Sequence, residues 1–349
     1  MKNLVIGDLH FGTKSNSQQW LQYQINYFEK QIFNVVQDNL FDRIIFLGDL
    51  TDIRWAINQQ IGCELKNLIR KLSKLYKETN PEGKIIFIAG NHDYFSPLEE
   101  FHKYNSYETI FGKEFTQIHD NVIFVNNQPL FDEENDEALY LPWFYTENPD
   151  NFSAILYDYK HPNVIFCHDD LSAWDISRIA SLRGANVYSG HIHFGWEDKD
   201  NHLYNLTAAM AFNFNDINQE RYLYVIENGK IVEKIKNEIT PVFKRLFNEE
   251  IFNDFSEEYF ENSFVQLMIN KTNINKAEYI ERLKEIKTKY SEKYSVSIKL
   301  YDNLHEFDKI EFSPIQTNIN EYIGNNVPDH LTDKYNIVKE LLTNDNQEY

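Results

Sequence analysis

The sequence predicts an α/β fold in which a sheet is covered by helices on both faces, followed by a smaller α/β unit and a helical tail. Large apolar runs that end at Gly7, Gly48 and Gly90 predict buried strands. Between them, segments 18–39 and 57–76 carry apolar residues at the three- and four-residue spacing of helices. A chain in which strands and helices alternate is expected to form parallel strands joined by crossover helices.

The composition is typical of a globular protein with a sizeable core. The 349 residues are 42% hydrophobic and 15% aromatic, which suits one large domain with one or two small ones. No apolar run approaches the roughly 18–20 residues that span a bilayer. The N-terminus enters the first strand without a signal-peptide pattern. We therefore expect a cytoplasmic protein that does not associate with membranes.

The formal charge of −20 restricts the partners that a long-range field can attract. A strongly acidic protein repels nucleic acid at a distance, which argues against a generic basic DNA-binding protein. Salt screens exposed charges beyond about 8 Å, so local basic patches and metal ions still decide close contacts. The two cysteines, Cys63 and Cys167, predict neither a disulfide framework nor a zinc ribbon.

Five apolar runs end in residue types that ligate metal ions. Asp8 and His10 follow the first run, Asp49 the second, Asn91 the third, His168 the fourth, and His191 and His193 the fifth. Active sites of open α/β sheets lie at the ends of the strands, so we expect these side chains to meet. The mixture of carboxylate, imidazole and amide suits Mn²⁺, Fe²⁺ or Zn²⁺. Seven ligands are too many for one ion but suit two ions that share a carboxylate.

Two ions roughly 3.5–4 Å apart lower the pKa of a water molecule and stabilise an in-line phosphoryl displacement. The leaving group of that reaction needs a general acid. His92 lies beside the candidate ligand Asn91 without being needed as a ligand, and an imidazole has a suitable pKa at neutral pH. We therefore predict that His92 is the acid.

Taken together, these motifs resemble the calcineurin-like metallophosphoesterase superfamily over about residues 1–210. The motifs are Asp8-Leu9-His10, Gly48-Asp49-Leu50-Thr51-Asp52, Gly90-Asn91-His92-Asp93, His168 and Gly190-His191-Ile192-His193. The resemblance implies a metallophosphoesterase β-sandwich flanked by helices, with His92 as the catalytic histidine. It also implies two divalent ions, one held by Asp8, His10, Asp49 and His193 and the other by Asp49, Asn91, His168 and His191.

Within the superfamily, the chain resembles the SbcD-type nuclease subunit of double-strand-break repair complexes, especially its compact tailed-phage version. The segments that carry this resemblance include Asp52-Ile53-Arg54, Leu141-Pro142-Trp143 and Glu321-Tyr322-Ile323. The resemblance implies Mn²⁺-dependent endonuclease and 3′–5′ exonuclease action on DNA ends, in a bacterium or a phage-infected host. It also implies a homodimer and an SbcC-type coiled-coil ATPase that binds the tail.

Two acidic residues in these motifs allow more than one role. Asp52 either orients His10 or another ligand, or caps the turn that follows it. Asp93 is expected to support a ligand or the fold rather than to bind metal. Four aromatic residues near the last motif either stack on nucleobases or pack in the core, with core packing favoured: Phe194, Trp196, Phe212 and Phe214.

The domain boundaries follow from a change of pattern after the last motif. Residues 1–240 are predicted to form the two-metal domain, which includes a hairpin at Asn228-Gly229. Residues 241–310 form a small α/β DNA-capping domain with strands at 264–269 and 295–300 and a helix at 276–290, and Pro241 begins a linker into it. Residues 311–349 form a linker and a helical tail, which binds a partner through about residues 319–342.

A basic stripe on the helix of the small domain is a candidate DNA contact. Arg282, Lys289 and Lys293 fall on one side of this helix, where they either track phosphates or form a solvated flank. Two alternatives to a nuclease remain at this point. One is a phosphoesterase of the same superfamily that acts on nucleotides or phosphoproteins. The other is a metal-free scaffold on the same fold.

Overall fold

The computed structural model describes residues 1–52, 54, 57–96, 104–145, 149–159, 161–217, 219–273, 276–290 and 294–301. The chain forms two compact units. The first contains Met1–Arg245, Asp254–Gln266 and Lys289–Ser297; the second contains Leu246–Asn253, Leu267–Thr288 and, among the described residues, 298–301. The predicted partner-binding tail at 311–349 lies outside the described residues.

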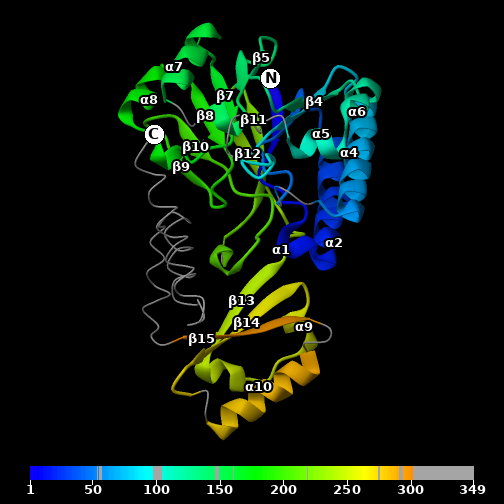
Figure 1. The fold of residues 1–349 in the computed structure, drawn as a ribbon, viewed down its shortest axis with the longest axis vertical. Coiled ribbons are helices and arrows are strands. Elements are labelled where there is room, and N and C mark those ends of the chain that lie inside the picture. The colour runs from blue at the N-terminus through cyan, green and yellow to red at the C-terminus, as the bar shows by residue number, and fades with distance from the viewer. Residues whose placement is uncertain are drawn as a thin grey trace, which may run out of the picture. The chain divides into compact units, whose positions relative to one another are not determined.

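The first unit is built on two six-stranded sheets (Figure 1). In the first sheet, the order is β12-β11-β1-β2-β3-β4, and β1 to β4 are parallel neighbours. Its strands are β1 Lys2–Ile6, β2 Arg43–Phe46, β3 Lys84–Ile88, β4 Val122–Val125, β11 Tyr222–Glu227 and β12 Lys230–Lys236. The antiparallel pair β11 and β12 is joined at Asn228 and Gly229, which have φ of 48° and 70°, and this confirms the predicted hairpin.

The second sheet has the order β5-β6-β7-β8-β10-β9. Its strands are β5 Leu130–Asp132, β6 Ala138–Tyr140, β7 Val164–Cys167, β8 Asn186–Ser189, β9 Trp196–Asp198 and β10 Leu203–Asn205. Strands β6, β7, β8 and β10 are parallel, while β5 and β9 are antiparallel edges. The strands predicted to end at the ligand residues are therefore distributed over both sheets.

The sheets pack face to face, and helices cover their outer faces. Val5 of β1 belongs to the apolar layer between the sheets, whereas its neighbours Leu4 and Ile6 belong to the layer under the helices. This alternation explains why the strands are apolar throughout, since both of their faces are buried. Figure 1 shows α2 and α4 beside the first sheet and α7 and α8 beside the second. The predicted α/β sandwich flanked by helices is confirmed.

The predicted helices at 18–39 and 57–76 are both present. The first is α2 Gln18–Tyr27, continued by a π-helical turn at Phe28–Ile32 and α3 Phe33–Asp38, and the second is α4 Gln59–Thr79. The other helices of this unit are α1 Thr13–Asn16, α5 Ser106–Ile110, α6 Lys113–Ile118, α7 Pro149–Asp158, α8 Ile176–Ser181 and α9 Glu257–Phe260. Short 3₁₀ turns occur at Trp143–Tyr145, Leu171–Ala173, Phe214–Asp216 and Asn248–Phe252.

A three-stranded sheet in the order β13-β14-β15 follows. Its elements are β13 Val242–Phe247, β14 Ser263–Asn270, α10 Ala277–Tyr290 and β15 Ser295–Tyr301, so the predicted strand, helix and strand are confirmed. The prediction of a linker at Pro241 was wrong, because β13 begins at the next residue. Proline suits the position before a strand, where no ladder hydrogen bond is required of it. No helix in the described part of the chain is both long and apolar enough to cross a membrane.

Candidate metal centre

The ends of β1, β2, β3, β7 and β8 bring all seven predicted ligands to one place in the first unit. One cluster contains Asp8, His10 and His193, and another contains Asp49, His168 and His191. Within each cluster the candidate ligand atoms lie within 4.8 Å of one another. Asn91 joins the second cluster through its amide oxygen, which lies 3.1 Å from His168 Nε2 and 3.1 Å from His191 Nδ1.

The first cluster points nitrogen and oxygen atoms at a common centre. His10 Nε2 lies 3.0 Å from His193 Nε2. Asp8 Oδ2 lies 3.7 Å from His193 Nε2 and 4.0 Å from His10 Nε2. Asp8 also accepts a hydrogen bond from the His191 backbone N–H at 3.1 Å, so its carboxylate ties the first strand end to the fifth.

The Asp49 carboxylate faces both clusters with the same atom. Its Oδ2 lies 3.6 Å from His10 Nε2 and 3.3 Å from His168 Nε2. Its other oxygen accepts the backbone N–H of His92 at 2.8 Å, which fixes the orientation of the carboxylate. Asp49 is 2% exposed. It is therefore placed to be the carboxylate that two ions share.

Asp52 orients two histidines at once. Its Oδ1 lies 3.1 Å from His10 Nδ1, and its backbone carbonyl lies 2.6 Å from His92 Nδ1. The carbonyl contact places a proton on His92 Nδ1, because a carbonyl oxygen accepts hydrogen bonds, and the Asp52 carboxylate faces His10 Nδ1 at ion-pair distance. His10 is thereby left with Nε2 for the cluster. A carboxylate at the far nitrogen of a metal-binding histidine also raises its basicity as a ligand.

A backbone carbonyl fixes the ring orientation of His168. Leu47 O lies 2.8 Å from His168 Nδ1, so the ring donates there and presents Nε2 to the second cluster. His168 is completely buried. The orientation of both buried histidines is thus set from outside the cluster.

The Asn91 amide contacts the cluster with one end and Arg54 with the other. The amide end away from the cluster lies 3.0 Å from Arg54 Nη2. In this orientation the inward oxygen lies against His168 Nε2, which carries a proton in the metal-free centre and where a cation would take the place of that proton. In the opposite orientation the inward NH₂ group donates to Asp49 at 3.2 Å and the outward oxygen accepts from Arg54.

The acid–base state of the centre depends on its carboxylates. Burial lowers the pKa of His10, but the Asp52 hydrogen bond and the charge of Asp49 outweigh it and raise the pKa to about 9. The pKa of His168 is likewise reduced by burial but raised to about 10 by Asp49 and Asp8. Burial raises the pKa of Asp49, but His168 and His92 hold it well below its usual value.

The pKa values of the other two histidines, His191 and His193, are lowered instead. Burial and the charge of His168 lower the pKa of His191 to about 4. Burial and the charge of His10 lower the pKa of His193 well below its usual value. Without metal, His10 and His168 are therefore protonated, and burial also raises the pKa of Asp8 against the charges of His168 and His10.

The backbone around the ligands is strained in the way that functional sites often are. His10, Asp49 and His191 have φ of 47°, 47° and 77°, a region that residues with side chains seldom adopt. Gly48 has φ of 112°, and a Cβ there would lie 2.4 Å from His168 Nδ1. At Gly90 a Cβ would lie 2.2 Å from Asp49 Oδ1. The motif glycines therefore let the strand ends approach one another closely.

Asp93 supports the second and third strand ends and does not belong to the metal clusters. Its carboxylate accepts from the backbone N–H groups of Leu50, Thr51 and Gly90 at 3.0–3.2 Å. It also accepts from the hydroxyls of Ser106 at 3.0 Å and Tyr107 at 3.2 Å. With 1% of its surface exposed, it holds the loops that present Asp49 and Asn91.

Two buried amides that sequence reasoning missed hold the remaining ligand loops. Gln24 Nε2 donates to the carbonyls of Leu9 at 2.7 Å and His10 at 3.0 Å. Asn205 Nδ2 donates to the carbonyls of Ile192 at 2.6 Å and Phe194 at 2.7 Å, on either side of His193. A polar residue on the apolar face of the predicted helix was the available signal for Gln24.

The residues of the basic stripe are distant in sequence from these clusters, and they differ in their contacts. Arg282 donates to the carbonyls of Ile251 at 2.8 Å and Asn253 at 2.5 Å and pairs with Glu285 at 2.7 Å. The ammonium of Lys289 lies 5.0 Å from the centre of the Tyr290 ring. Lys293 lies outside the described residues.

The donor set fits two divalent cations. Carboxylate, amide and imidazole acceptors face one another at 3.0–3.7 Å, and such contacts between acceptors require either protons or cations to be favourable. Asp8, His10, Asp49 and His193 would hold one ion, and Asp49, Asn91, His168 and His191 the other. A centre of this type belongs to metal-dependent hydrolases.

Comparison with known families agrees with this class. The family model for calcineurin-like phosphoesterases matches residues 1–249, well over half of the chain, and the protein belongs to this family. Members of this family hydrolyse phosphoesters, and their fold uses divalent metal ions. The His and Asp clusters of this protein could bind such ions. A search of curated proteins finds no match.

Proposed function

We propose that this protein is a Mn²⁺-dependent DNA nuclease that hydrolyses phosphodiester bonds at DNA ends, as the catalytic subunit of a recombination or repair complex. The observation that carries the proposal is the Asp49 carboxylate, shared between two ligand clusters, with the oriented imidazole of His92 beside it. Mn²⁺ accepts such a mixture of oxygen and nitrogen ligands.

In this reaction the protein's own residues position the centre and supply the proton. When bound, a pair of divalent ions supplies charge stabilisation for the phosphoryl oxygens and lowers the pKa of water. The water gives up one proton to solvent, and its oxygen forms a bond to phosphorus while the bond to the leaving oxygen breaks. His92 is held at Nδ1 by the Asp52 carbonyl, which leaves Nε2 to give its proton to that leaving oxygen.

DNA is favoured as substrate by the sequence resemblance to SbcD-type nucleases and by the α/β elements that follow the family match. The basic stripe of Arg282, Lys289 and Lys293 is proposed to contact phosphates. Replacing all three by alanine should weaken DNA binding and flatten its dependence on salt, because each lost phosphate contact reduces counterion release. Unchanged binding across a salt series would exclude the stripe.

The test of the proposed activity is digestion of linear, end-labelled DNA by the purified chain in Mn²⁺, with and without chelator. Asp49→Ala is run in parallel as the metal-site variant. A 3′–5′ exonuclease shortens a 5′-labelled strand progressively and releases mononucleotides from a 3′-labelled one. Cleavage that needs metal and is lost in the variant supports the proposal.

The contrary result would point to another substrate of the same family. If DNA stays intact with and without an added ATPase while a phosphomonoester or a mononucleotide is hydrolysed, the protein is a nucleotide or phosphoprotein phosphoesterase. If no phosphoester is hydrolysed in any divalent metal, the scaffold alternative holds. Comparing the three substrate classes in one assay therefore separates the alternatives.

The proposed assembly is a homodimer in the cytoplasm of a bacterium or a phage-infected host, bound to an SbcC-type coiled-coil ATPase. The amphipathic tail at about residues 319–342 is proposed to bind the ATPase. Deleting residues 319–349 should abolish co-purification with the ATPase while the isolated chain still hydrolyses a small phosphodiester. Co-purification that survives the deletion would place the interface elsewhere.

A further inference from the structure

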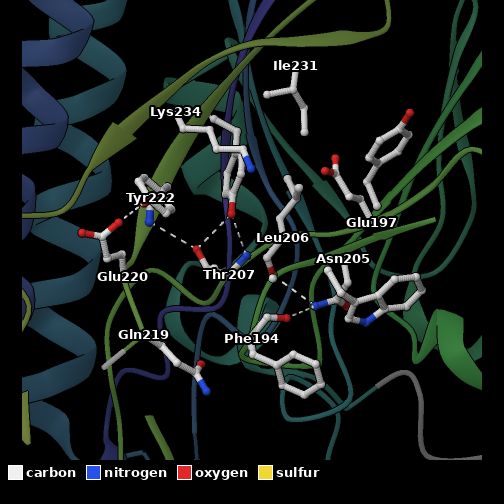
Figure 2. Close-up of a pocket in the computed structure, with 14 residues that line it drawn as sticks. Phe194, Glu197, Asn205, Leu206, Thr207, Gln219, Glu220, Tyr222, Ile231 and Lys234 are labelled. Carbon is white, nitrogen blue, oxygen red and sulfur yellow. Dashed lines mark hydrogen bonds between the residues drawn. The ribbon is translucent and has the colours of Figure 1, made fainter. Parts of the chain in front are cut away.

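A cavity of about 710 Å³ opens between the edges of the two sheets (Figure 2). Strands β11 and β12 form one wall and β9 and β10 the other, at the ends of the two sheet orders. In the middle of the sandwich, the layer between the sheets is filled by apolar side chains such as Val5 and Ile45. At this edge it is left open, with a volume in the usual range of ligand sites.

The cavity walls carry an unusual density of aromatic rings. The lining includes Phe194, Trp196 and Tyr204 from the second sheet and its loops, and Tyr222 and Tyr224 from the first. Tyr224 is buried, and the other four are partly exposed. Tyr204 and Tyr222 also pack on the apolar layer between the sheets, and Trp196 packs on the layer under α7 and α8. Phe212 packs between His10, His193 and Trp20, and Phe214 packs on Phe243.

The charges around the cavity are neutralised by lysines close to it. Glu197 pairs with Lys199 at 3.3 Å, and Glu220 pairs with Lys236 at 2.8 Å. The ammonium of Lys234 lies 5.8 Å from the centre of the Tyr224 ring. The charged side chains of the lining itself are Glu197, Glu220 and Lys234, and each carboxylate is paired with a lysine just outside the lining. Aromatic walls whose carboxylates are paired suit a flat heterocycle.

The cavity shares its walls with the loops that carry the metal ligands. Phe194 lines it and directly follows His193, and Asn205 lines it while holding the carbonyls on both sides of His193. Thr207 lines it as well, and its carbonyl oxygen lies 2.2 Å from the place where a Cβ of Gly7 would be, one residue before Asp8. A group held in the cavity therefore lies against the loops that carry Asp8 and His193.

From these observations we propose that the cavity binds a nucleobase of the strand being cut, on a nucleotide adjacent to the scissile phosphate. The proposal rests on the proposed function and adds the substrate contact that selects nucleic acid over other phosphodiesters. Bases stack on aromatic side chains whatever their identity, so the contact tolerates any sequence. A nuclease that trims DNA ends needs such tolerance.

The test combines an altered substrate with an altered protein. Short single strands are prepared in which one nucleotide at a time, counted from the 3′ end, is abasic, so that sugar and phosphate remain and only the base is lost. In the wild-type protein with Mn²⁺, one position relative to the cut should lower kcat/KM about 10- to 100-fold, the usual effect of a lost base–ring stack. In Trp196→Ala, the abasic nucleotide at that position should cost much less, because the ring that it contacts is gone.

Matched variants distinguish the loss of base binding from a general effect of the substitution on folding. Trp196→Phe should retain the sensitivity to the abasic position, and Tyr222→Ala on the opposite wall should lose it as Trp196→Ala does. Tyr157→Ala, at a ring 74% exposed on α7, removes an aromatic side chain elsewhere and should behave as wild type. Kinetics on ethyl 4-nitrophenyl phosphate, which has no base, provide the reference for each variant.

Each result decides between the proposals. If no abasic position lowers kcat/KM, or if the loss is as large in Trp196→Ala and Tyr222→Ala as in wild type, the cavity does not bind a base, although the nuclease activity stands. If the wild-type protein hydrolyses the small diester but no DNA strand, with or without the added ATPase, both proposals fail together.

Discussion

The release of protons on metal binding follows from the structure of the centre and can be measured directly. Without metal, His10 and His168 have pKa values of about 9 and about 10, because buried carboxylates face them. His191, with a pKa of about 4, is already neutral at pH 7.5, and so is His193, whose pKa is lowered further by burial and by the charge of His10. Metal ligation requires neutral imidazole.

The expected number of protons can be worked out from these values. At pH 7.5 both raised histidines are almost fully protonated, so metal binding should release about two protons per chain from these two rings. At pH 9.5, midway between the two pKa values, the release should fall to about one. Between pH 6.5 and 7.5, the overall binding constant for two ions should rise about 100-fold, since each released proton contributes a factor of about ten per pH unit.

The same shifts set how the stability of the metal-free protein depends on pH. Both folded pKa values lie above the unfolded value of about 6.5. The stabilisation from the two ion pairs is therefore fully present below about pH 6.5 and is lost as the pH rises through about 9 and about 10. The metal-loaded protein should not show this loss, because its histidines are neutral throughout.

The assay is isothermal titration of Mn²⁺ into metal-free protein in buffers of different ionisation enthalpy at one pH. The slope of the observed enthalpy against the buffer enthalpy gives the protons released. His202→Gln, at an exposed histidine outside the centre, is the matched control and should give the wild-type slope. Release of less than about half a proton at pH 7.5 would refute the reasoning from His10 and His168.

Three further substitutions test single contacts in the centre. His92→Ala should keep the bound metal, measured by elemental analysis, and lose about 10²–10⁴ in kcat; near wild-type turnover would remove His92 as the acid. Asp52→Asn should weaken metal binding about 10- to 100-fold in titrations, because the charge at His10 Nδ1 is lost; unchanged affinity would leave Asp52 as a turn residue. Gly48→Ala should lower the unfolding free energy by about 1–3 kcal/mol in denaturant titrations, since φ is 112° and the new Cβ meets His168; wild-type stability would contradict this close approach.

The sequence predicted which residues meet at this centre because strand ends are visible in it. A run such as residues 44–47 is apolar on both faces, and the Gly48-Asp49 pair that ends it indicates both the turn and the functional side chain. The crossover helices were visible for the same reason, since α4 keeps an apolar face over its 21 residues. These signals are local, and each can be read from a short window of the chain.

The contacts that hold the ligand residues in place could not be predicted, because they depend on how distant loops meet. Asp52 touches His10 with its side chain and His92 with its backbone, and nothing in the spacing of these residues indicates that arrangement. Asn205 hydrogen-bonds to the loop around His193, twelve positions earlier in the chain. The strands between them, β9 and β10, have only three residues each, which is too short for a periodic pattern in the sequence. Tertiary contacts of this kind decide the geometry of a site whose residue types the sequence already reveals.

The most direct test of the account is the metal content of wild-type protein and Asp49→Ala after equilibrium dialysis against Mn²⁺. The same Asp49 oxygen lies 3.6 Å from His10 Nε2 and 3.3 Å from His168 Nε2, so its removal affects both clusters. We expect about two ions per wild-type chain and the loss of both in the variant. A variant that keeps two ions would contradict the shared carboxylate, and with it the two-metal centre described for this chain.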